Sequence, residues 1–356
     1  MSVNSNAALI LHLDQWPAPD RIAWDAGRVP GSILDGRAYA EDLRPTTIRN
    51  AARGYGRWLA FLQKADPSAL QHPPGARVTP QRVRLFLAAL QAAGNTNNTI
   101  KARFWELRAT LRIMLPDHDF RWLNYPAGQS LHAMLPTVLQ PVGIMDIHIL
   151  EQWGQEMMAA ARDLPVSLRR SVLHRNGLLV AILANRAPRI RSLADLRVGR
   201  GIFHDGACYR LEFSAAETKG KRRLGYALHR SLITHIDHYL AVERPILLGM
   251  KTHDWFWVGN DGDRFGIRGI EGALRRASMA RFGHCVGTHS FRHALATASM
   301  IANPTTPGTI AAVLGNSPAV VEAHYALGGQ LEAGARFQDV LEQERAQTAA
   351  LARQLF

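Results

Sequence analysis

Cysteine is scarce in this sequence, and its two cysteines lie far apart. Cys208 and Cys285 belong to no Cys-x-x-Cys pair and to no cluster of Cys and His. Disulfide frameworks and structural zinc sites both need closely patterned cysteines. We therefore expect a reduced protein without a disulfide framework and without a metal site.

Long hydrophobic runs are also missing. The longest, residues 177–184, is far shorter than the roughly 18 apolar residues that span a bilayer, and it is typical of a buried helix. The first residues, MSVNSNAALILHLDQWP, lack a basic start and match a signal peptide poorly. We expect a soluble cytoplasmic protein with no membrane partner.

Negative charge is in short supply as well. The chain has 42 Lys and Arg against 29 Asp and Glu, which gives a formal net charge of +13. Such an excess favours a polyanionic partner, because each phosphate that a cation neutralises releases condensed counterions. Nucleic acids, membrane surfaces and acidic proteins all fit that description, so the charge alone does not choose among them.

The 356 residues are enough for two domains. Residues 1–40 are rich in Pro, Gly and Asp and show no sustained period, so we expect an arm or irregular lead-in. In residues 41–138, apolar residues recur three times at helical spacing, which predicts a small all-helical domain. The three apolar faces include Ile48, Ala52, Tyr55, Leu59 and Leu62, then Val83, Phe86, Leu87 and Leu90, then Ile100, Phe104, Leu107, Leu111 and Met114.

The third of these helices also has basic residues away from its apolar face. This set suits contact with phosphates and equally suits a solvated surface. We select it as a candidate DNA contact, formed by Lys101, Arg103, Arg108 and Arg112.

The second half of the chain is organised differently. Residues 139–144, which begin with LQPVG, are typical of a linker, and residues 145–330 form the predicted second domain. Within it, residues 208–228 change from a helical to an alternating pattern: YRLEF is followed by the turn-rich TKGKRR and then by LGYAL. This predicts a β-hairpin with a basic tip.

Four features of the second domain fit one kind of site. Arg189 follows the apolar helix, and Lys219 lies in the predicted hairpin turn. His289 and Arg292 stand three residues apart in THSFRH and so share one helix face, while Tyr325 ends LGNSPAVVEAHY. Each alone has an ordinary explanation, since helix-end Arg and turn Lys are usually solvated and a helical Tyr usually packs. Their joint order is what indicates function.

This order resembles the catalytic domain of the tyrosine recombinases, or phage-type integrases. That family has an Arg after an apolar helix, a Lys on a β-hairpin, an HxxR box, and an LGHS-type turn nine residues before the nucleophilic Tyr. The matching stretches here are NRAPRIRSLADLR, ETKGKRR, THSFRHALAT and LGNSPAVVEAHY, and Asn316 precedes Tyr325 by nine residues. The likeness covers residues 145–330 and, more weakly, residues 45–125, which are similar to the helical core-binding domain.

The resemblance implies a mainly α fold with a small β-sheet, in which a core-binding domain and a catalytic domain form a C-shaped DNA clamp. It implies a site-specific recombinase that cuts and rejoins double-stranded DNA through a 3′-phosphotyrosine, without cofactor or metal. The alternatives are a catalytically weak DNA-binding accessory protein and a type IB topoisomerase-like relaxing enzyme. The expected setting is the nucleoid of a bacterium, with the gene carried by the bacterium or by a mobile element.

The family chemistry assigns a role to each residue of the pattern. Arg189 and Arg292 clamp the nonbridging oxygens of the phosphate with donors that never titrate, and Tyr325 is the nucleophile. His289 assists proton transfer or orients the phosphate.

The hairpin tip offers more than one cation. Lys219 is the favoured general acid for the departing 5′ oxygen, since a hairpin can carry a cationic donor to the groove. Lys221 competes for that role, and Lys221 and Arg222 are candidate DNA contacts.

Two positions depart from the family pattern. Asn316 stands where the family has His or Trp, and its amide can donate a hydrogen bond but cannot titrate. Ser192 stands three residues after Arg189, where an acidic residue is common, and Asp195 can brace Arg189 in its place.

Residues 331–356 are expected to form a tail helix. Phe337, Val340 and Leu341 make an apolar stripe, which can pack on its own protomer. The resemblance implies instead that the tail docks on a neighbour, in a homotetramer that joins two DNA sites.

Asn316 yields a direct prediction. If its amide contacts a nonbridging oxygen, Asn316→Ala slows single-turnover cleavage by about 10- to 1000-fold and leaves binding to intact DNA unchanged, whereas Asn316→His retains substantial activity. If Asn316 only caps a helix, Asn316→Ala lowers the stability by about 1 kcal/mol and spares the cleavage rate. A shifted melting curve beside an unchanged rate would remove Asn316 from the active site.

Overall fold

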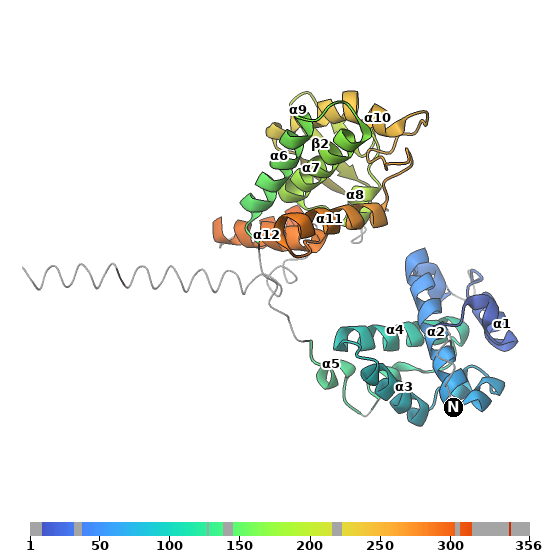
Figure 1. Cartoon of the computed structure of the whole chain (residues 1–356). Helices are drawn as coiled ribbons and strands as arrows, with labels where there is room; N and C mark the ends of the chain where they lie inside the picture. The colour runs from blue at the N-terminus through green and yellow to red at the C-terminus, as the bar shows by residue number, and fades with distance from the viewer. Residues whose placement is uncertain are drawn as a thin grey trace, which may run out of the picture. The chain divides into compact units, whose positions relative to one another are not determined.

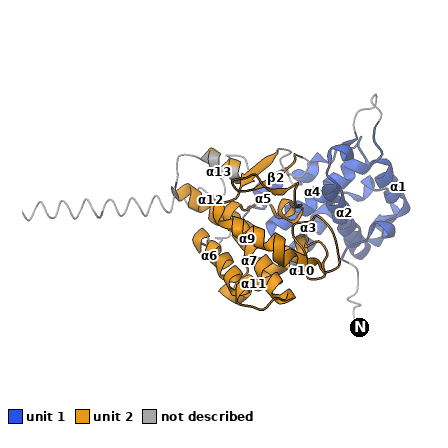
Figure 2. Cartoon of the chain, turned by 90° about the horizontal axis from the view of Figure 1, so that it is seen from above, with its two compact units in different colours: residues 1–140 blue, residues 141–356 orange. Residues whose placement is uncertain are grey.

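The structure is a computed structural model. It describes residues 9–31, 38–126, 128–137, 145–215, 223–302 and 307–314, together with residue 342. The chain divides into two compact units, residues 1–140 and 141–356 (Figure 2). The division falls inside residues 139–144, the segment that the sequence analysis assigns to a linker.

Unit 1 is built from helices (Figure 1). Its two longest helices, α2 (Pro45–Ala65) and α4 (Asn97–Met114), pack against each other, and α1 (Ala18–Ala26) and α3 (Pro80–Ala92) pack on α4. The Thr79 hydroxyl caps α3 by accepting a hydrogen bond from the backbone N–H of Arg82 at 3.3 Å. The remaining elements are the short helix α5 (Leu131–Met134) and 3-10 turns at Leu13–Gln15, Tyr39–Asp42, Pro67–Gln71, Gly75–Arg77 and Arg121–Asn124.

The N-terminal segment differs from the irregular lead-in that the sequence predicts. Residues 18–26 form α1, and the side chains of Trp16 and Trp24 lie in the core of unit 1. The ring of Trp16 meets that of Tyr55 on α2 edge-on, with 4.9 Å between centroids. Burial of two indole rings is a strong driving force for ordering a short segment, so this part of the N-terminal region belongs to the helical core.

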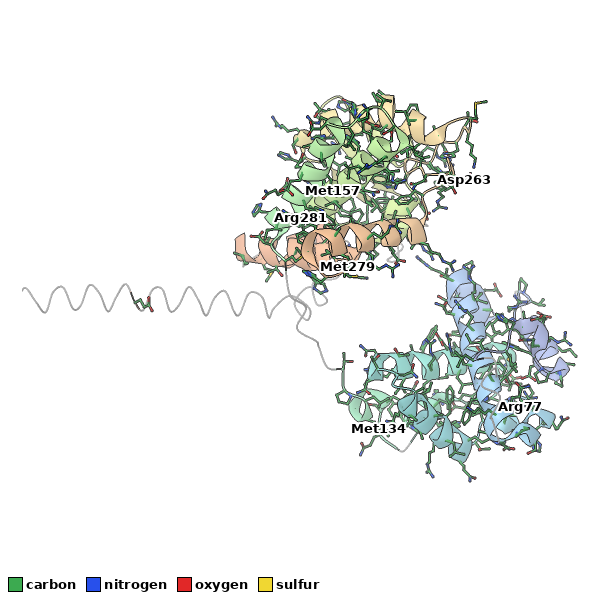
Figure 3. The ribbon with its side chains drawn as sticks, viewed as in Figure 1. Arg77, Met134, Met157, Asp263, Met279 and Arg281 are labelled. Carbon is green, nitrogen blue, oxygen red and sulfur yellow. The ribbon has the colours of Figure 1, made fainter. Side chains whose placement is uncertain are left out.

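A buried charge pair also fastens α1 to the rest of unit 1. Asp20 accepts hydrogen bonds from Nη1 of Arg77 at 2.5 Å and from the Tyr55 hydroxyl at 2.6 Å, and all three side chains are buried. Arg77, which lies among the helices of unit 1 in Figure 3, also donates to the carbonyls of Leu70 at 2.9 Å and His72 at 2.7 Å. Burial, followed by the charge of Asp20, raises the pKa of Tyr55 well above its usual range.

Unit 2 combines helices with one small sheet, so the mainly α fold with a small β-sheet is confirmed. Strands β1 (Ile202–His204), β2 (Tyr209–Phe213) and β3 (Leu224–Ala227) are antiparallel in the order β1-β2-β3, and Leu211 pairs with Tyr226. The predicted hairpin is therefore β2 and β3. The helices are α6 (Ile147–Arg162), α7 (Leu168–Arg186), α8 (Ile190–Ala194), α9 (Ile233–His238), α10 (Arg244–Leu248), α11 (Ile267–Phe282), α12 (Thr288–Ala302) and α13 (Pro307–Leu314), with a 3-10 turn at Arg230–Leu232 and a π-helical turn at Tyr239–Glu243.

Helix α7 contains the apolar run 177–184, and all of these residues are buried. Two glycines let α6 lie close against it: a Cβ placed on Gly177 would stand 2.9 Å from the carbonyl oxygen of Gly154. Any side chain at either position would push the helices apart. Within the described ranges, no helix is both long and apolar enough to cross a membrane. Helix α7 is thus held firmly in the core of unit 2, and its C-terminal end lies three residues before Arg189.

The Asp20–Arg77 pair gives a stability prediction. Arg77→Ala leaves a buried carboxylate without its cation, so the free energy of unfolding of unit 1 should fall by about 3–5 kcal/mol. Hydrogen exchange of the α1 and α2 amides across a urea series measures this loss. Arg121→Ala is the matched control, because Arg121 pairs with Asp119 at the exposed surface and should leave that exchange nearly unchanged. Equal exchange in the two variants would contradict the role of the buried pair.

Candidate active site

Arg189 lies just after a sharp turn at the end of α7. Ala187 ends that helix in the left-handed conformation, with φ 41° and ψ 51°, and among the described residues it is the one non-glycine with positive φ. Pro188 follows, and because proline has no backbone N–H it cannot donate the hydrogen bond that would continue the helix. Arg189 then adopts an extended conformation and begins α8 as its N-cap residue. The sequence NRAPR thus becomes a strained turn, and local strain is often found at functional sites.

Arg292 is buried in α12, with 5% of its surface exposed. Its Nη1 donates to the carbonyl of Ala187, and its Nη2 donates to the carbonyl of Leu314, each at 2.7 Å. Both carbonyls lie at helix C-termini, where backbone oxygens lack helical partners and the helix dipole is negative. One guanidinium therefore connects the turn before Arg189 with Leu314, which is the first residue of the LGNS segment.

The side chain of Tyr226 on β3 shows that the two arginines lie in one region. Burial raises the pKa of Tyr226, and Arg292, Arg189 and Arg186 each lower it by their charge. The geometry agrees, because Arg292 donates to the carbonyl of Ala187, which stands two residues before Arg189 and directly after Arg186. The structure thus brings together the two arginines that the sequence motifs single out from distant positions.

Hydrogen bonds from the end of α7 hold β3 in place beside these arginines. Nε of Arg186 donates to the carbonyl of Ala227 at 2.8 Å, and the side-chain oxygen of Asn185 accepts from the backbone N–H of His229 at 3.2 Å. The hairpin is therefore anchored at its base to the same helix end that presents Arg189. No sequence motif distinguishes Tyr226, because its place in the alternating pattern is that of an ordinary core residue.

His289 lies in the first turn of α12, one turn before Arg292, and its side chain is exposed. It lines a small cavity of about 250 Å³ together with Glu271, Arg275 and Cys285. The HxxR spacing predicts that His289 and Arg292 share one face of the helix. On that face the imidazole of His289 is exposed and the guanidinium of Arg292 is buried. That arrangement suits a proton-transfer group at the surface of a site whose cation is fixed beneath it.

Five of the candidate residues lie outside the described residues: Lys219, Lys221, Arg222, Asn316 and Tyr325. The structure shows where the segments that carry them begin. Arg223, at the base of the hairpin tip, pairs with Glu212 at 2.7 Å, and Leu314 ends α13 at the carbonyl that Arg292 holds. The expected tail, residues 331–356, also lies outside the described residues, apart from residue 342.

The structure gives Asp195 a different cation from the one expected. Its carboxylate accepts a hydrogen bond from Arg264, whose guanidinium also lies over the ring of Trp255, 4.0 Å from its centroid. Ser192 is buried in α8. The contact between Asp195 and Arg264 therefore holds the C-terminal end of α8 against the segment before α11. Because Arg189 is the N-cap residue of α8, this contact also helps to position Arg189.

One face of α4 carries a basic stripe in unit 1. It consists of positions spaced by three and four residues, which share a helix face. The sequence pattern groups Arg103 with these candidate DNA contacts, but Arg103 lies elsewhere on the helix. It donates to both carboxylate oxygens of Glu106, at 2.5 and 2.7 Å. We call the stripe the α4 basic face; it comprises Lys101, Trp105, Arg108 and Arg112.

Contacts within unit 1 orient part of the α4 basic face. Nζ of Lys101 donates to the Thr137 hydroxyl at 2.6 Å, and the guanidinium of Arg112 lies 3.9 Å from the centroid of the Tyr39 ring. Trp105 is 39% exposed. A cationic stripe with a partly exposed aromatic ring is a surface suited to a nucleic acid.

Unit 2 has a second basic region, a cavity of about 900 Å³ between α7 and the start of α11. Arg175 lies buried in its wall, donates to the carbonyl of Val258 at 2.7 Å and packs over the Phe265 ring. Arg264, Arg268 and Arg276 also line this cavity. In the part of the chain that the structure describes, no group of three or more His, Cys, Asp and Glu is placed to hold a metal ion.

Comparison with solved structures identifies the fold. No protein-family model and no curated protein matches the sequence. The XerH site-specific recombinase in its post-cleavage complex with a palindromic difH substrate is 16% identical, with a TM-score of 0.57 over 84% of this chain and 82% of that one. The Tn1549 transposon integrase in complex with transposon right end DNA is 12% identical, with a TM-score of 0.56 over 91% and 99%. Both are tyrosine recombinases, and this chain has their fold.

The left-handed turn at Ala187 gives a prediction. Ala187→Gly removes the strain but adds entropy to the unfolded chain, so the free energy of unfolding should change by less than about 1 kcal/mol. Ala187→Val places a β-branched residue in the left-handed region and should cost about 1–3 kcal/mol. Denaturant unfolding of the full chain, followed at unit 2, measures both. Equal stability of the two variants would show that residue 187 does not adopt this conformation.

Proposed function

We propose that this chain is a site-specific DNA recombinase that cuts and rejoins strands through a 3′-phosphotyrosine at Tyr325. The observation that carries the proposal is the hydrogen bond from Arg292 to the carbonyl of Ala187, which holds Arg292 at the end of α7, two residues before Arg189. Its fold is that of the XerH recombinase, which was captured on difH DNA, and of a transposon integrase bound to transposon DNA. The order of motifs around Tyr325 supports the same activity.

The chemistry follows from the charge of the phosphodiester. In the cleavage step the phenol oxygen of Tyr325 bonds to phosphorus, and the bond from phosphorus to the 5′ oxygen breaks. That oxygen takes a proton from Lys219, with Lys221 as the alternative donor, while His289 assists removal of the phenol proton. The phosphotyrosine keeps the bond energy, so attack by a second 5′ hydroxyl reverses the step and joins the strands.

Arg292 supports this chemistry by being fixed before DNA arrives. Its bonds to the carbonyls of Ala187 and Leu314 set the plane and position of the guanidinium. A donor that needs no reorganisation stabilises the charge that develops on the nonbridging oxygens more effectively than a mobile one. Removal of such a donor typically slows a reaction by about 100- to 1000-fold.

The DNA contacts follow from the distribution of cations in each unit. We place the α4 basic face against the sugar-phosphate backbone, with the hairpin-tip cations Lys221 and Arg222 contributing from unit 2. Binding of this kind weakens steeply as salt rises. Joining two DNA sites requires more than one protomer, so we propose a homotetramer in which residues 331–356 dock on a neighbouring copy. In a cell this protein would act on the nucleoid or on a mobile element.

Tyr325→Phe tests the proposed function. The full chain is expressed in cells, and DNA that remains attached under denaturing conditions is recovered with the protein. We expect Tyr325→Phe to abolish these complexes and to keep salt-sensitive DNA binding, because phenylalanine lacks only the attacking oxygen. Tyr125→Phe is the matched control, since Tyr125 is an exposed tyrosine of unit 1, and it should retain the complexes.

Three results would contradict the proposal. Covalent complexes that persist in Tyr325→Phe would place the nucleophile elsewhere. A parent chain that binds DNA but forms no covalent complex would indicate a DNA-binding accessory protein. Complexes that relax supercoiled DNA without ever joining two sites would indicate a relaxing enzyme.

A further inference from the structure

Tyr226 is the least explained buried polar residue near the two arginines. Its side chain is 7% exposed. It lies on β3 opposite Leu211 and packs edge-on against the ring of Phe213, with 6.0 Å between centroids. Neighbouring Gly225 and Ala227 are exposed. The ring is therefore held by the core on one side of the strand.

The hydroxyl of Tyr226 differs from those of the other buried tyrosines. Tyr55 donates to Asp20 at 2.6 Å, Tyr209 donates to Asp237 at 2.6 Å, and Tyr239 donates to the carbonyl of Phe256 at 3.0 Å. Among the described residues, the Tyr226 hydroxyl has no such acceptor, and its oxygen is not one of the fully buried polar atoms that lack a partner, so it reaches the surface although the ring is buried. A hydroxyl at the surface without an acceptor in the protein can donate to a partner that binds from outside.

The charges around Tyr226 define that partner. Arg186 donates to the carbonyl of Ala227, the next residue on β3. Arg292 donates to the carbonyl of Ala187, one residue after Arg186 and two before Arg189, so both arginines lie at the helix end that holds β3. A guanidinium has no acceptor to offer a hydroxyl. An oxyanion accepts from guanidiniums and from a hydroxyl together, so it fits all of these donors at once.

We propose that Tyr226 donates a hydrogen bond to a nonbridging oxygen of the scissile phosphate that Arg189 and Arg292 hold. This inference rests on the proposed function and adds a residue that no sequence motif singles out. The hydroxyl keeps its proton throughout. Burial raises the pKa of Tyr226 above its usual range, so the group is a neutral donor at any pH at which the enzyme would work.

Tyr226→Phe is a sharp test, because phenylalanine preserves the ring and removes only the donor. The probe is a nicked duplex carrying the DNA sequence recovered from the covalent complexes of the parent chain. We expect the single-turnover cleavage rate to fall by about 10- to 100-fold, while the affinity for the intact duplex and the melting temperature stay unchanged. Tyr209→Phe is the matched control from the same sheet and should cleave at the parent rate, since the Tyr209 hydroxyl is bonded to Asp237.

The identity of the oxygen gives a second readout that a packing role would not produce. In a duplex with a methylphosphonate at the scissile position, one of the two nonbridging oxygens is a methyl group. Parent and Tyr226→Phe should then react alike with one stereoisomer and differ with the other. An effect of the same size with both stereoisomers would overturn the proposed contact.

The outcomes separate this inference from the proposed function. If the parent chain and Tyr226→Phe cleave the phosphodiester equally fast, the role of Tyr226 is overturned and the proposed function is not affected. A slower variant whose melting temperature falls with the rate assigns Tyr226 to packing and also overturns it. A parent chain without any covalent complex refutes the proposed function, and the role of Tyr226 with it.

Discussion

The two hydrogen bonds that Arg292 donates hold together the parts of unit 2 that carry the candidate site. One accepting carbonyl, that of Ala187, stands two residues before Arg189, and the other, that of Leu314, stands two residues before Asn316. Helices α7, α12 and α13 therefore meet at a single buried cation. Because this guanidinium satisfies two helix ends and is also the cation that we propose for phosphate binding, its structural role and its proposed chemical role depend on each other.

Buried arginines that bond to backbone carbonyls recur in this chain. Arg77 does so in unit 1, with Asp20 as its charge partner, and Arg175 does so beside the basic cavity of unit 2. On α4, Arg103 is paired with Glu106. Some of the 42 Lys and Arg residues are thus committed to folding. Fewer cations are therefore available to contact a polyanion than the composition indicates, and several of them lie on the α4 basic face.

The regular elements could be predicted from the sequence, and the long-range contacts could not. The hairpin within residues 208–228 and the apolar helix α7 follow from local periodicity. Helix α1 was missed because its stability comes from distant partners, above all Arg77, which no local pattern shows. Tyr226 looked like a core residue because the alternation of apolar and polar residues along a strand predicts only that the ring is buried. It does not predict what surrounds the hydroxyl group. The motif around Tyr325 lies outside the described residues, so its role stays a prediction.

The most direct measurement is the identity of the residue that carries DNA. Covalent complexes of the full chain, trapped by denaturation, would be digested with nuclease and protease, and the peptide bearing the residual nucleotide would be sequenced by tandem mass spectrometry. We predict a nucleotide joined through its 3′ phosphate to Tyr325. A nucleotide on another residue, or one joined through a 5′ phosphate, would contradict it.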